Sequence, residues 1–168
     1  MLFYLILALL FAIIVIIQSS FFSFFFVGQA LPDILLVFVI VLGFLMRERR
    51  GAILGLIAGL FQDILFGQAL GYFALAKMIL GFLAGLVGRE IYRERIYGPL
   101  FLVFGGTLLH ELLLFVMVNH FIGSVSFEMN MLQHIVIMAL FNTLLTVLVF
   151  PLLYKLHLIG KRWGIKDY

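Results

Sequence analysis

The residues GAILGLIAGLFQDILFGQALGYFALAKMILGFLAGLVGRE, positions 51–90, contain two apolar stretches with small residues at four-residue intervals. The first row consists of Gly51, Gly55, Gly59 and Asp63, and Gly67 and Gly71 keep the spacing through the turn that follows. The second row consists of Lys77, Gly81, Gly85 and Arg89. Positions four apart share one helix face, and small residues let helix backbones approach closely in lipid. The stretch predicts two tightly packed antiparallel membrane helices.

These rows of small residues have two interpretations. Helices of the same chain can pack through them, or they can form a docking surface for another membrane protein. Ala8 and Ala12 form a similar, shorter row near the start of the chain. The spacing alone does not separate the two interpretations.

The composition indicates a membrane protein with little mass outside the bilayer. Apolar residues make up 65% of the 168 positions and charged residues 11%, against about a quarter charged in soluble domains. A soluble fold could not cover its surface with so few polar side chains. The composition therefore excludes a soluble enzyme, a nucleic-acid-binding domain and a disordered regulator. The chain has no cysteine, which excludes disulfides and thiolate metal sites.

The apolar stretches predict an all-α membrane protein, a six-transmembrane-helix bundle. Because a spanning helix needs about 20 residues, the chain holds at most about six spans. The expected helices cover about 2–17, 31–46, 51–66, 72–88, 97–119 and 131–154. The stretches are continuously apolar, and apolar and polar residues do not alternate in them with a period of two, which excludes a β-barrel. We expect a retained first helix rather than a signal peptide, with a break near Gln18 left open.

The basic residues predict the orientation. Ten of the eleven Lys and Arg residues follow expected helices two, four and six: Arg47, Arg49, Arg50, Arg89, Arg93, Arg95, Lys155, Lys161, Arg162 and Lys166. Basic loops stay in the cytoplasm, so both termini are expected to be cytoplasmic. We divide the chain into a transmembrane domain, 1–154, and a basic cytoplasmic tail, 155–168, which anionic lipid would attract.

Asp63 and Lys77 are the two charged residues expected deepest in the helix pair. Counted from the cytoplasmic ends of their helices, Asp63 lies about 18 Å deep and Lys77 about 17 Å deep. A charge at such depth is costly unless it is paired. We therefore expect a buried Asp63–Lys77 ion pair that braces the two helices. In the alternative, Asp63 faces a central cavity and Lys77 extends outward to water.

Other polar residues are candidates for a helix start and for a cavity. Pro32 and Asp33 suit the first positions of a helix. Four further polar residues lie in the last two expected helices: His110, Glu111, His134 and Asn142. Glu111 could meet Asn142 or Thr143, either as a hydrogen-bonded helix contact or in a ligand cavity or proton path.

The sequence gives no support for catalysis or for a resident metal or cofactor. No nucleophile elbow, phosphate-binding loop or HExxH pair is present. A zinc site built from His110, Glu111 and His134 is therefore not expected. We expect a protein that is not an enzyme, with no metal and no cofactor.

An ordered set of these features resembles the rod shape-determining protein MreD family. The set begins with Pro32-Asp33, the basic turn at 47–50 and the glycine row that ends at Asp63. It continues with Gly67, Gly71, Ala74, Lys77 and Gly81, and it ends at the second basic turn, whose last residue is Arg95. It covers about 64 residues, while the C-terminal half matches only in hydrophobic pattern.

The resemblance implies a non-enzymatic scaffold in the bacterial inner membrane. Members of this family belong to the rod (elongation) complex, which directs lateral peptidoglycan synthesis and rod cell shape. The implied partners are the bitopic protein MreC, RodA, a penicillin-binding transpeptidase, MreB and membrane lipid, with no nucleic acid. The motif from Pro32 to Gly85 would serve partner binding or structure.

The family also looks like the substrate-binding subunits of energy-coupling-factor vitamin transporters. The alternative function is therefore such a subunit, and the Ala8 and Ala12 row would suit docking to a transporter's coupling subunit. The short outer loops, poor in polar residues, count against it. A small molecule retained by the purified protein would separate the two functions.

Overall fold

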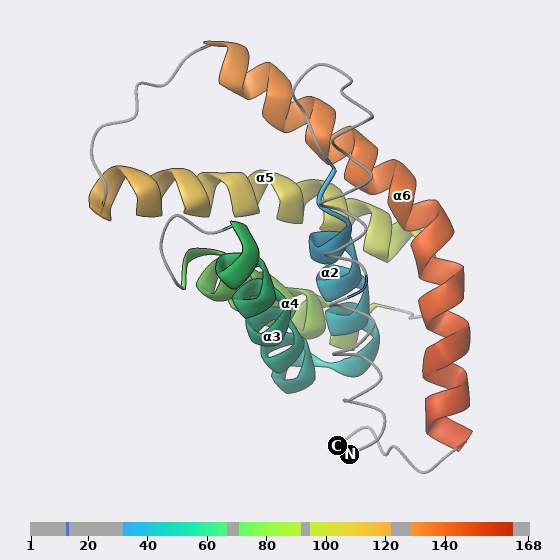
Figure 1. The fold of residues 1–168 in the computed structure, drawn as a ribbon. Helices are drawn as coiled ribbons and strands as arrows, with labels where there is room; N and C mark the ends of the chain where they lie inside the picture. Colours follow the sequence, from blue (N-terminus) through green and yellow to red (C-terminus); the bar gives the residue numbers. More distant parts are fainter. Residues whose placement is uncertain (1–12, 14–31, 67–70, 92–94, 122–128, 163–168) are drawn as a thin grey trace.

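The structure is a computed structural model that describes residues 13, 32–66, 71–91, 95–121 and 129–162. The described residues form five α-helices and no strand (Figure 1). They are α2 (Ile34–Met46), α3 (Glu48–Phe66), α4 (Tyr72–Glu90), α5 (Tyr97–Phe121) and α6 (Met129–Arg162). The expected first helix with Ala8 and Ala12, the break near Gln18, and Gly67 lie outside these residues. The all-helical prediction is confirmed for the described part, and the count of six spans stays a prediction.

Three of the described helices are long and apolar enough to cross a membrane. They are α4, α5 and, within α6, the stretch Met131–Leu158. A fourth, α2, is apolar but has only 13 residues. At the α-helical rise it is about 20 Å long, which is shorter than the hydrocarbon core of a bilayer, about 30 Å. Such a short helix requires that other helices cover its ends or that the bilayer becomes thinner around it.

Helix α2 forms the centre of the described part. Every residue from Leu35 to Met46 is buried, and α3, α4, α5 and α6 all contact this helix. Figure 1 shows α2 between the α3–α4 pair, α5 and α6. A helix that is apolar on all sides presents no polar face to water, so it is stable in the interior. The core of the protein is therefore built around α2.

Helices α3 and α4 pack with their backbones in contact. A Cβ atom added to Gly51 would lie 2.1 Å from the carbonyl oxygen of Gly81, and one added to Gly81 would lie 2.1 Å from that of Gly51. A Cβ on Gly55 would lie 2.1 Å from the carbonyl oxygen of Lys77. Real Cβ atoms do not approach backbone so closely, so only glycine fits these positions. The glycine rows thus pack against each other within one chain.

The helix ends differ from the expected ones where the chain leaves the apolar stretches. Arg47 alone separates α2 from α3, at a φ of 75°, so α3 includes residues 48–50 of the basic turn that was expected as a loop. Helix α6 runs to Arg162, past the expected end at Tyr154, and contains Pro151. Basic side chains do not interrupt helical hydrogen bonding once the helix reaches water, and membrane helices tolerate proline. The expected boundary at 154 and 155 therefore falls inside one continuous helix.

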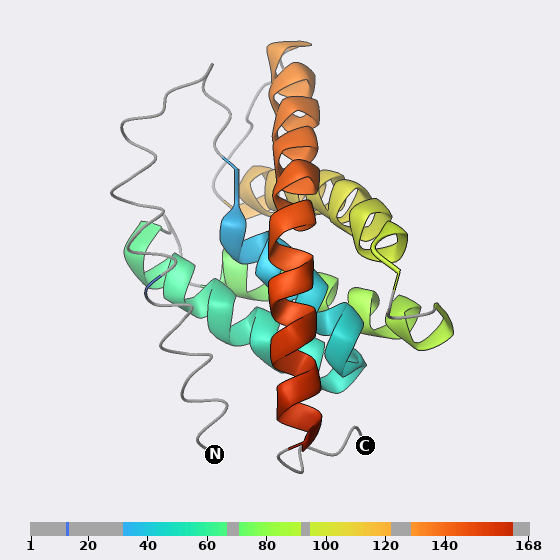
Figure 2. The ribbon, with the colours of Figure 1, turned by 90° about the vertical axis from the view of Figure 1, so that its right-hand side faces the viewer.

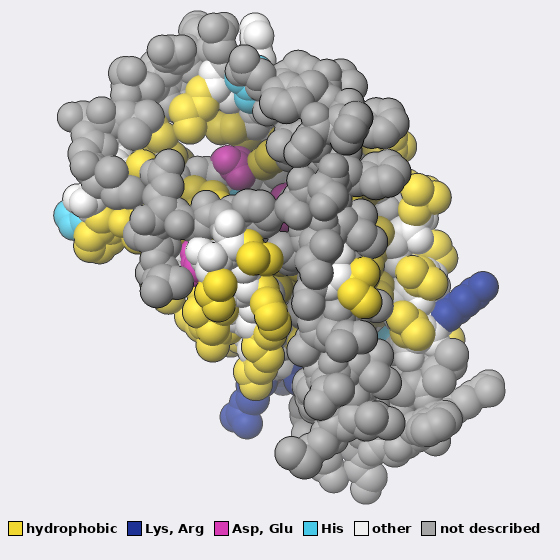
Figure 3. All heavy atoms as spheres, in the orientation of Figure 1, with side chains coloured by type: hydrophobic (Ala, Val, Ile, Leu, Met, Phe, Trp, Pro, Cys, Tyr) yellow, Lys and Arg dark blue, Asp and Glu magenta, His cyan; other side chains and the backbone are white. Residues whose placement is uncertain are grey.

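Helix α6 runs along one side of the described part, across α2 and α5 (Figure 2). It exposes a row of leucines four positions apart: Leu140, Leu144, Leu148, Leu152 and Leu156. Among the coloured side chains in Figure 3 most are hydrophobic, and the coloured Lys and Arg side chains lie in the lower half of the view. Such an apolar surface is suited to lipid or to other membrane helices.

Candidate functional site

A buried ion pair connects α4 to the start of α2. The side chain of Lys77 is fully buried, and its ammonium group bonds to the carboxylate of Asp33. Asp33 is the N-cap residue of α2, and its other carboxylate oxygen accepts a hydrogen bond of 2.9 Å from the backbone N of Leu36. A buried charge is tolerated when it is paired and hydrogen-bonded. Asp33 therefore caps α2 and neutralises Lys77 at the same time.

Two polar residues of α5 extend the ion pair toward the surface. The Nε2 atom of His110 lies 3.5 Å from Nζ of Lys77, and its Nδ1 atom lies 3.0 Å from Oε1 of Glu111. His110 is buried, while the side chain of Glu111 is 22% exposed. An imidazole that donates from Nδ1 to the carboxylate presents the lone pair of Nε2 to the ammonium group. The Phe73 ring stacks on His110 and lies 5.9 Å from Nζ of Lys77.

Helix α6 joins the same network through an amide. Oδ1 of Asn142 accepts a hydrogen bond of 2.9 Å from the backbone N of Asp33, and its Nδ2 donates to Oγ1 of Thr107 at 3.1 Å. Thr107 in turn donates to the carbonyl of Val103 at 2.8 Å, and Thr146 donates to the carbonyl of Asn142 at 2.9 Å. Asn142, Thr107 and Thr146 are fully buried.

The six residues Asp33, Lys77, Thr107, His110, Glu111 and Asn142 form the candidate site, which we call the polar network. It connects the start of α2 to α4, α5 and α6. Hydrogen bonds between membrane helices hold them in register, because an unpaired polar group in apolar surroundings is costly. The order carboxylate, ammonium, imidazole, carboxylate is also one that can pass a proton. The network can therefore fix helix positions, and a proton relay is its second chemical possibility.

The expected Asp63–Lys77 pair is wrong, because both residues have other partners. The carboxylate of Asp63 accepts three hydrogen bonds of 3.0 Å each from the backbone N atoms of Gly71, Phe73 and Ala74. These amides belong to the start of α4, where the first N–H groups of a helix have no partner within the helix. A negative charge at that position also meets the positive end of the helix dipole. Asp63 is therefore a cap for α4 supplied by α3.

We predict that Asp63→Ala lowers the stability of the purified protein by about 2–3 kcal/mol, because three buried or part-buried N–H groups at the start of α4 lose their acceptor. Asp63→Asn keeps one acceptor oxygen and should lose less. The exchange of Asp63 and Lys77 should not restore stability, since a lysine at 63 cannot accept a hydrogen bond. Thermal unfolding in mild detergent measures all three variants. Recovery in the exchanged variant would show that the two side chains do interact.

The other polar residues expected to contact one another in α5 and α6 have different partners in the structure. Glu111 bonds to His110 rather than to Asn142 or Thr143, and Thr143 donates to the carbonyl of Ala139 at 2.7 Å. His134 is half-buried, and its Nδ1 has no hydrogen-bond partner among the described residues. The interaction of Glu111 with Asn142 or Thr143 is therefore corrected to one with its own neighbour in α5.

The glycines that were candidates for partner binding are covered within the chain. Gly51, Gly55 and Gly59 face α4, and Gly81 and Gly85 face α3. Gly71 has a different role, since it precedes α4 with a φ of 107°, a conformation that favours glycine. A partner helix cannot reach the five covered glycines in this fold.

Two features of the polar network were absent from the sequence-based expectations. Asp33 was expected as a helix start and as part of the motif from Pro32 to Gly85, but not as the partner of Lys77, and Thr107 was not considered. A signal for Asp33 does exist: it lies at the start of α2, and Lys77 lies six residues after Gly71, which precedes α4. Both charges therefore lie near the N-terminal ends of their helices. Thr107 gives no such signal, because threonine often bonds to its own helix.

Comparison with known proteins adds an independent line of evidence. The sequence model of the family described as "rod shape-determining protein MreD" matches residues 1–157. Neither the curated proteins nor the solved structures give a significant match. The family match covers nearly the whole chain, and the apolar helices agree with it. The chain therefore belongs to the MreD family and is a membrane protein with a role in rod-shape determination.

Proposed function

We propose that this protein is a non-enzymatic scaffold of the bacterial rod (elongation) complex. In this proposal it binds the single-span protein MreC and supports lateral peptidoglycan synthesis together with RodA, a penicillin-binding transpeptidase and MreB. It is a multi-pass protein of the inner membrane with six spans. Both of its termini lie in the cytoplasm, and the basic stretches around Arg49, Arg95 and Lys161 face the same side.

One observation carries the scaffold proposal. The buried side chain of Lys77 bonds to Asp33 and contacts His110, and Asp63 bonds to backbone amides. Groups that bind a polar substrate or perform chemistry usually converge on a pocket. Here they connect helices, which favours a protein whose task is to hold a defined shape in the membrane.

The partner surface of this scaffold is apolar. The glycine rows are occupied within the chain, so a transmembrane helix of MreC would dock on exposed side chains. Association between membrane helices depends on close van der Waals packing more than on ion pairs. The contact is therefore expected to survive high salt and to weaken in harsh detergent.

We predict that MreC of the same organism co-purifies with the tagged protein from membranes in a gentle detergent. An unrelated single-span protein of the same membrane, expressed at the same level, is the control and should be lost during washing. Raising the salt concentration should leave the MreC yield unchanged, because salt screens only exposed charges.

The alternative function, a substrate-binding subunit of a vitamin transporter, predicts a different result. In that case mass spectrometry of the denatured, purified protein would detect a vitamin, and MreC would be absent from the eluate. That combination would replace the scaffold proposal with a substrate-binding subunit.

A further inference from the structure

Helices α5 and α6 meet near their middle parts and diverge from there. Nδ2 of Asn142 donates to Oγ1 of Thr107 at 3.1 Å, so these two residues mark where the helices are in contact. From this contact the end of α5 and the start of α6 separate toward residues 122–128, which connect them along the chain (Figure 1). If the two helices border an open space there, the residues on their facing sides must become exposed.

The inward face of α6 is covered over most of the helix and uncovered near its start. Ala139, Thr146 and Leu153 follow one another at seven-residue spacing, which places them on one helix face, and all three are buried. Leu132 precedes them by the same spacing and is 46% exposed. The face that packs against the other helices is therefore accessible at the start of α6.

The facing side of α5 changes in the same way. Thr107 is buried, Leu114 is half-buried and Phe121 is 70% exposed, again at seven-residue spacing. The two faces that meet at Thr107 and Asn142 therefore both become accessible toward residues 122–128. We call the space bordered by residues 111–121 of α5 and 129–138 of α6 the α5–α6 wedge.

A carboxylate lies on the wedge side of α5. Glu111 follows Thr107 by one helical turn, on the same side of the helix. Its Oε1 atom lies 3.0 Å from Nδ1 of His110, and its side chain is 22% exposed. The carboxylate is therefore held in place from one side, while a further hydrogen-bond donor can reach it from the wedge.

The polar network contains more negative than positive charge. Asp33 and Glu111 are carboxylates, and Lys77 supplies one positive charge. His110 is neutral, because the lone pair of its Nε2 atom faces the ammonium group of Lys77. Two negative charges and one positive charge leave a net charge of −1 in apolar surroundings, which is costly unless a cation balances it.

The place of Glu111 along α5 limits the source of that cation. Helix α5 is long and apolar enough to span a membrane. Glu111 lies ten residues from the last residue of the helix and fourteen from the first, or about 15 Å and 21 Å at the α-helical rise. Lipid headgroups lie at the ends of a spanning helix, and acyl chains carry no charge. The side chain of another membrane helix can bring a cation to this depth.

We propose that the α5–α6 wedge receives a transmembrane helix of a protein partner, and that a Lys or Arg side chain of this helix binds the carboxylate of Glu111. The accessible faces of α5 and α6 supply the close packing by which membrane helices associate, and the basic side chain balances the charge of the polar network. The inference rests on the proposed function, in which the partner is the single-span protein MreC. It adds the docking surface and the charge that the partner must carry.

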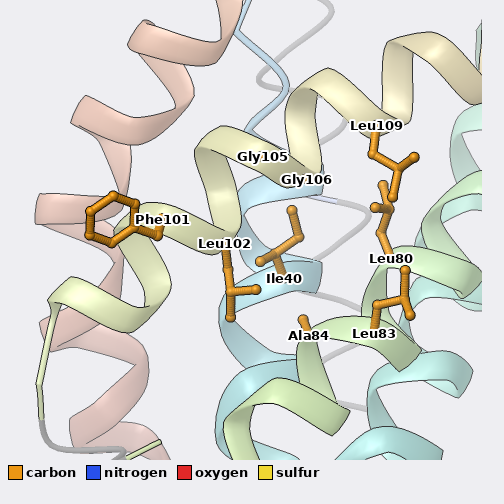
Figure 4. A pocket seen from close by; sticks show the side chains of 9 residues that line it. All are labelled: Ile40, Leu80, Leu83, Ala84, Phe101, Leu102, Gly105, Gly106 and Leu109. Carbon is orange, nitrogen blue, oxygen red and sulfur yellow. The ribbon is translucent and has the colours of Figure 1, made fainter.

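Photo-cross-linking in membranes that contain the full chain and MreC tests the docking surface. A photoreactive amino acid at Leu114 or Leu132, on the two sides of the wedge, should cross-link to MreC. Two exposed positions outside the wedge are controls and should give no such product. They are Phe101, which lines an apolar groove between α4 and α5 (Figure 4), and Leu144 of α6.

Two cross-linking results would overturn the inference and leave the proposed function intact. The first is a cross-link to MreC from the control positions and not from the wedge. The second is a cross-link from the wedge to residues 1–31 of the same chain in membranes where MreC co-purifies, because the protein itself would then cover the wedge.

Glu111→Gln tests the charge. Glutamine keeps an acceptor oxygen for Nδ1 of His110, so the thermal midpoint should stay close to that of the wild type. Loss of one partner of a buried charge pair should weaken the binding of purified, fluorescently labelled MreC in nanodiscs by at least about thirtyfold. Glu90→Gln, the same chemical change at an exposed position at the end of α4, should bind MreC like the wild type.

The binding experiment also separates the inference from the proposed function. Wild-type affinity in Glu111→Gln, or a membrane span of MreC without Lys or Arg, would overturn the inference alone. Failure of MreC to bind the wild-type protein would overturn the proposed function and the inference together.

Discussion

Lys77→Ala is expected to lower the stability of the protein by about 3–5 kcal/mol, the loss typical for one partner removed from a buried ion pair. Asp33 would then carry a buried negative charge with no cation beside it, and His110 would lose the ammonium group at 3.5 Å. For a chain of this length each kcal/mol shifts the thermal midpoint by about 2–4 °C. Thermal unfolding of the purified protein in mild detergent should therefore show a midpoint lower by roughly 6–20 °C.

The control for Lys77→Ala removes both charges. In Asp33→Asn with Lys77→Met, asparagine still caps α2, and methionine fills most of the volume of the lysine side chain. Replacement of a buried ion pair by uncharged residues of similar size is often neutral. This double variant should therefore be much more stable than Lys77→Ala. Arg49→Ala, which removes an exposed cation, should behave like the wild type. A double variant as unstable as Lys77→Ala would contradict the pairing.

The second large effect is expected at the contact between α3 and α4. In Gly55→Ala the new Cβ would lie 2.1 Å from the carbonyl oxygen of Lys77. The obstacle is backbone, so no side-chain rotation can relieve the clash, and the two helices must move apart. Overpacking of this kind costs about 3 kcal/mol or more. The yield of folded protein and its thermal midpoint should both fall.

Gly105→Ala is the matched control, since it makes the same chemical change in a helix where the new Cβ meets no atom within 4 Å. Alanine is a better helix former than glycine by about 1 kcal/mol. This variant should therefore be as stable as the wild type or slightly more stable. Equal destabilisation by the two variants would mean that the glycine rows do not form a close contact.

The helix pattern could be predicted well from the sequence, and the reason is physical. A membrane helix must satisfy its own backbone hydrogen bonds, so each long apolar stretch is helical. In four of the five described helices, both the first and the last residue therefore lie within three positions of the expected ones. The exception is α6, which continues to Arg162, because the basic residues from Lys155 onward were taken to end the helix although they do not interrupt it. The burial of α2 could also be read from its uninterrupted apolar sequence.

The polar network could be predicted only in part, because depth along a helix does not fix direction around it. Asp63 and Lys77 were placed level with each other by counting residues, and both do belong to helices in contact. The count did not consider that three amides at the start of α4 compete for the carboxylate of Asp63. The count also did not reveal that Asp33, at the start of α2, lies beside Lys77 and takes the place expected for Asp63. Contacts among three or more helices need the tertiary arrangement.

The central claim is that the polar network holds the helices in place and performs no chemistry of its own. Its most direct test is cell shape in a rod-shaped host depleted of its own MreD and complemented with Asp33→Asn, Lys77→Met, at a protein level matched to the wild type. If the charges are structural, the complemented cells should remain rods, while Lys77→Ala should give rounded cells with little folded protein. Rounded cells that contain the folded double variant at the wild-type level would contradict the claim, because the charges would then be needed for a proton or a ligand.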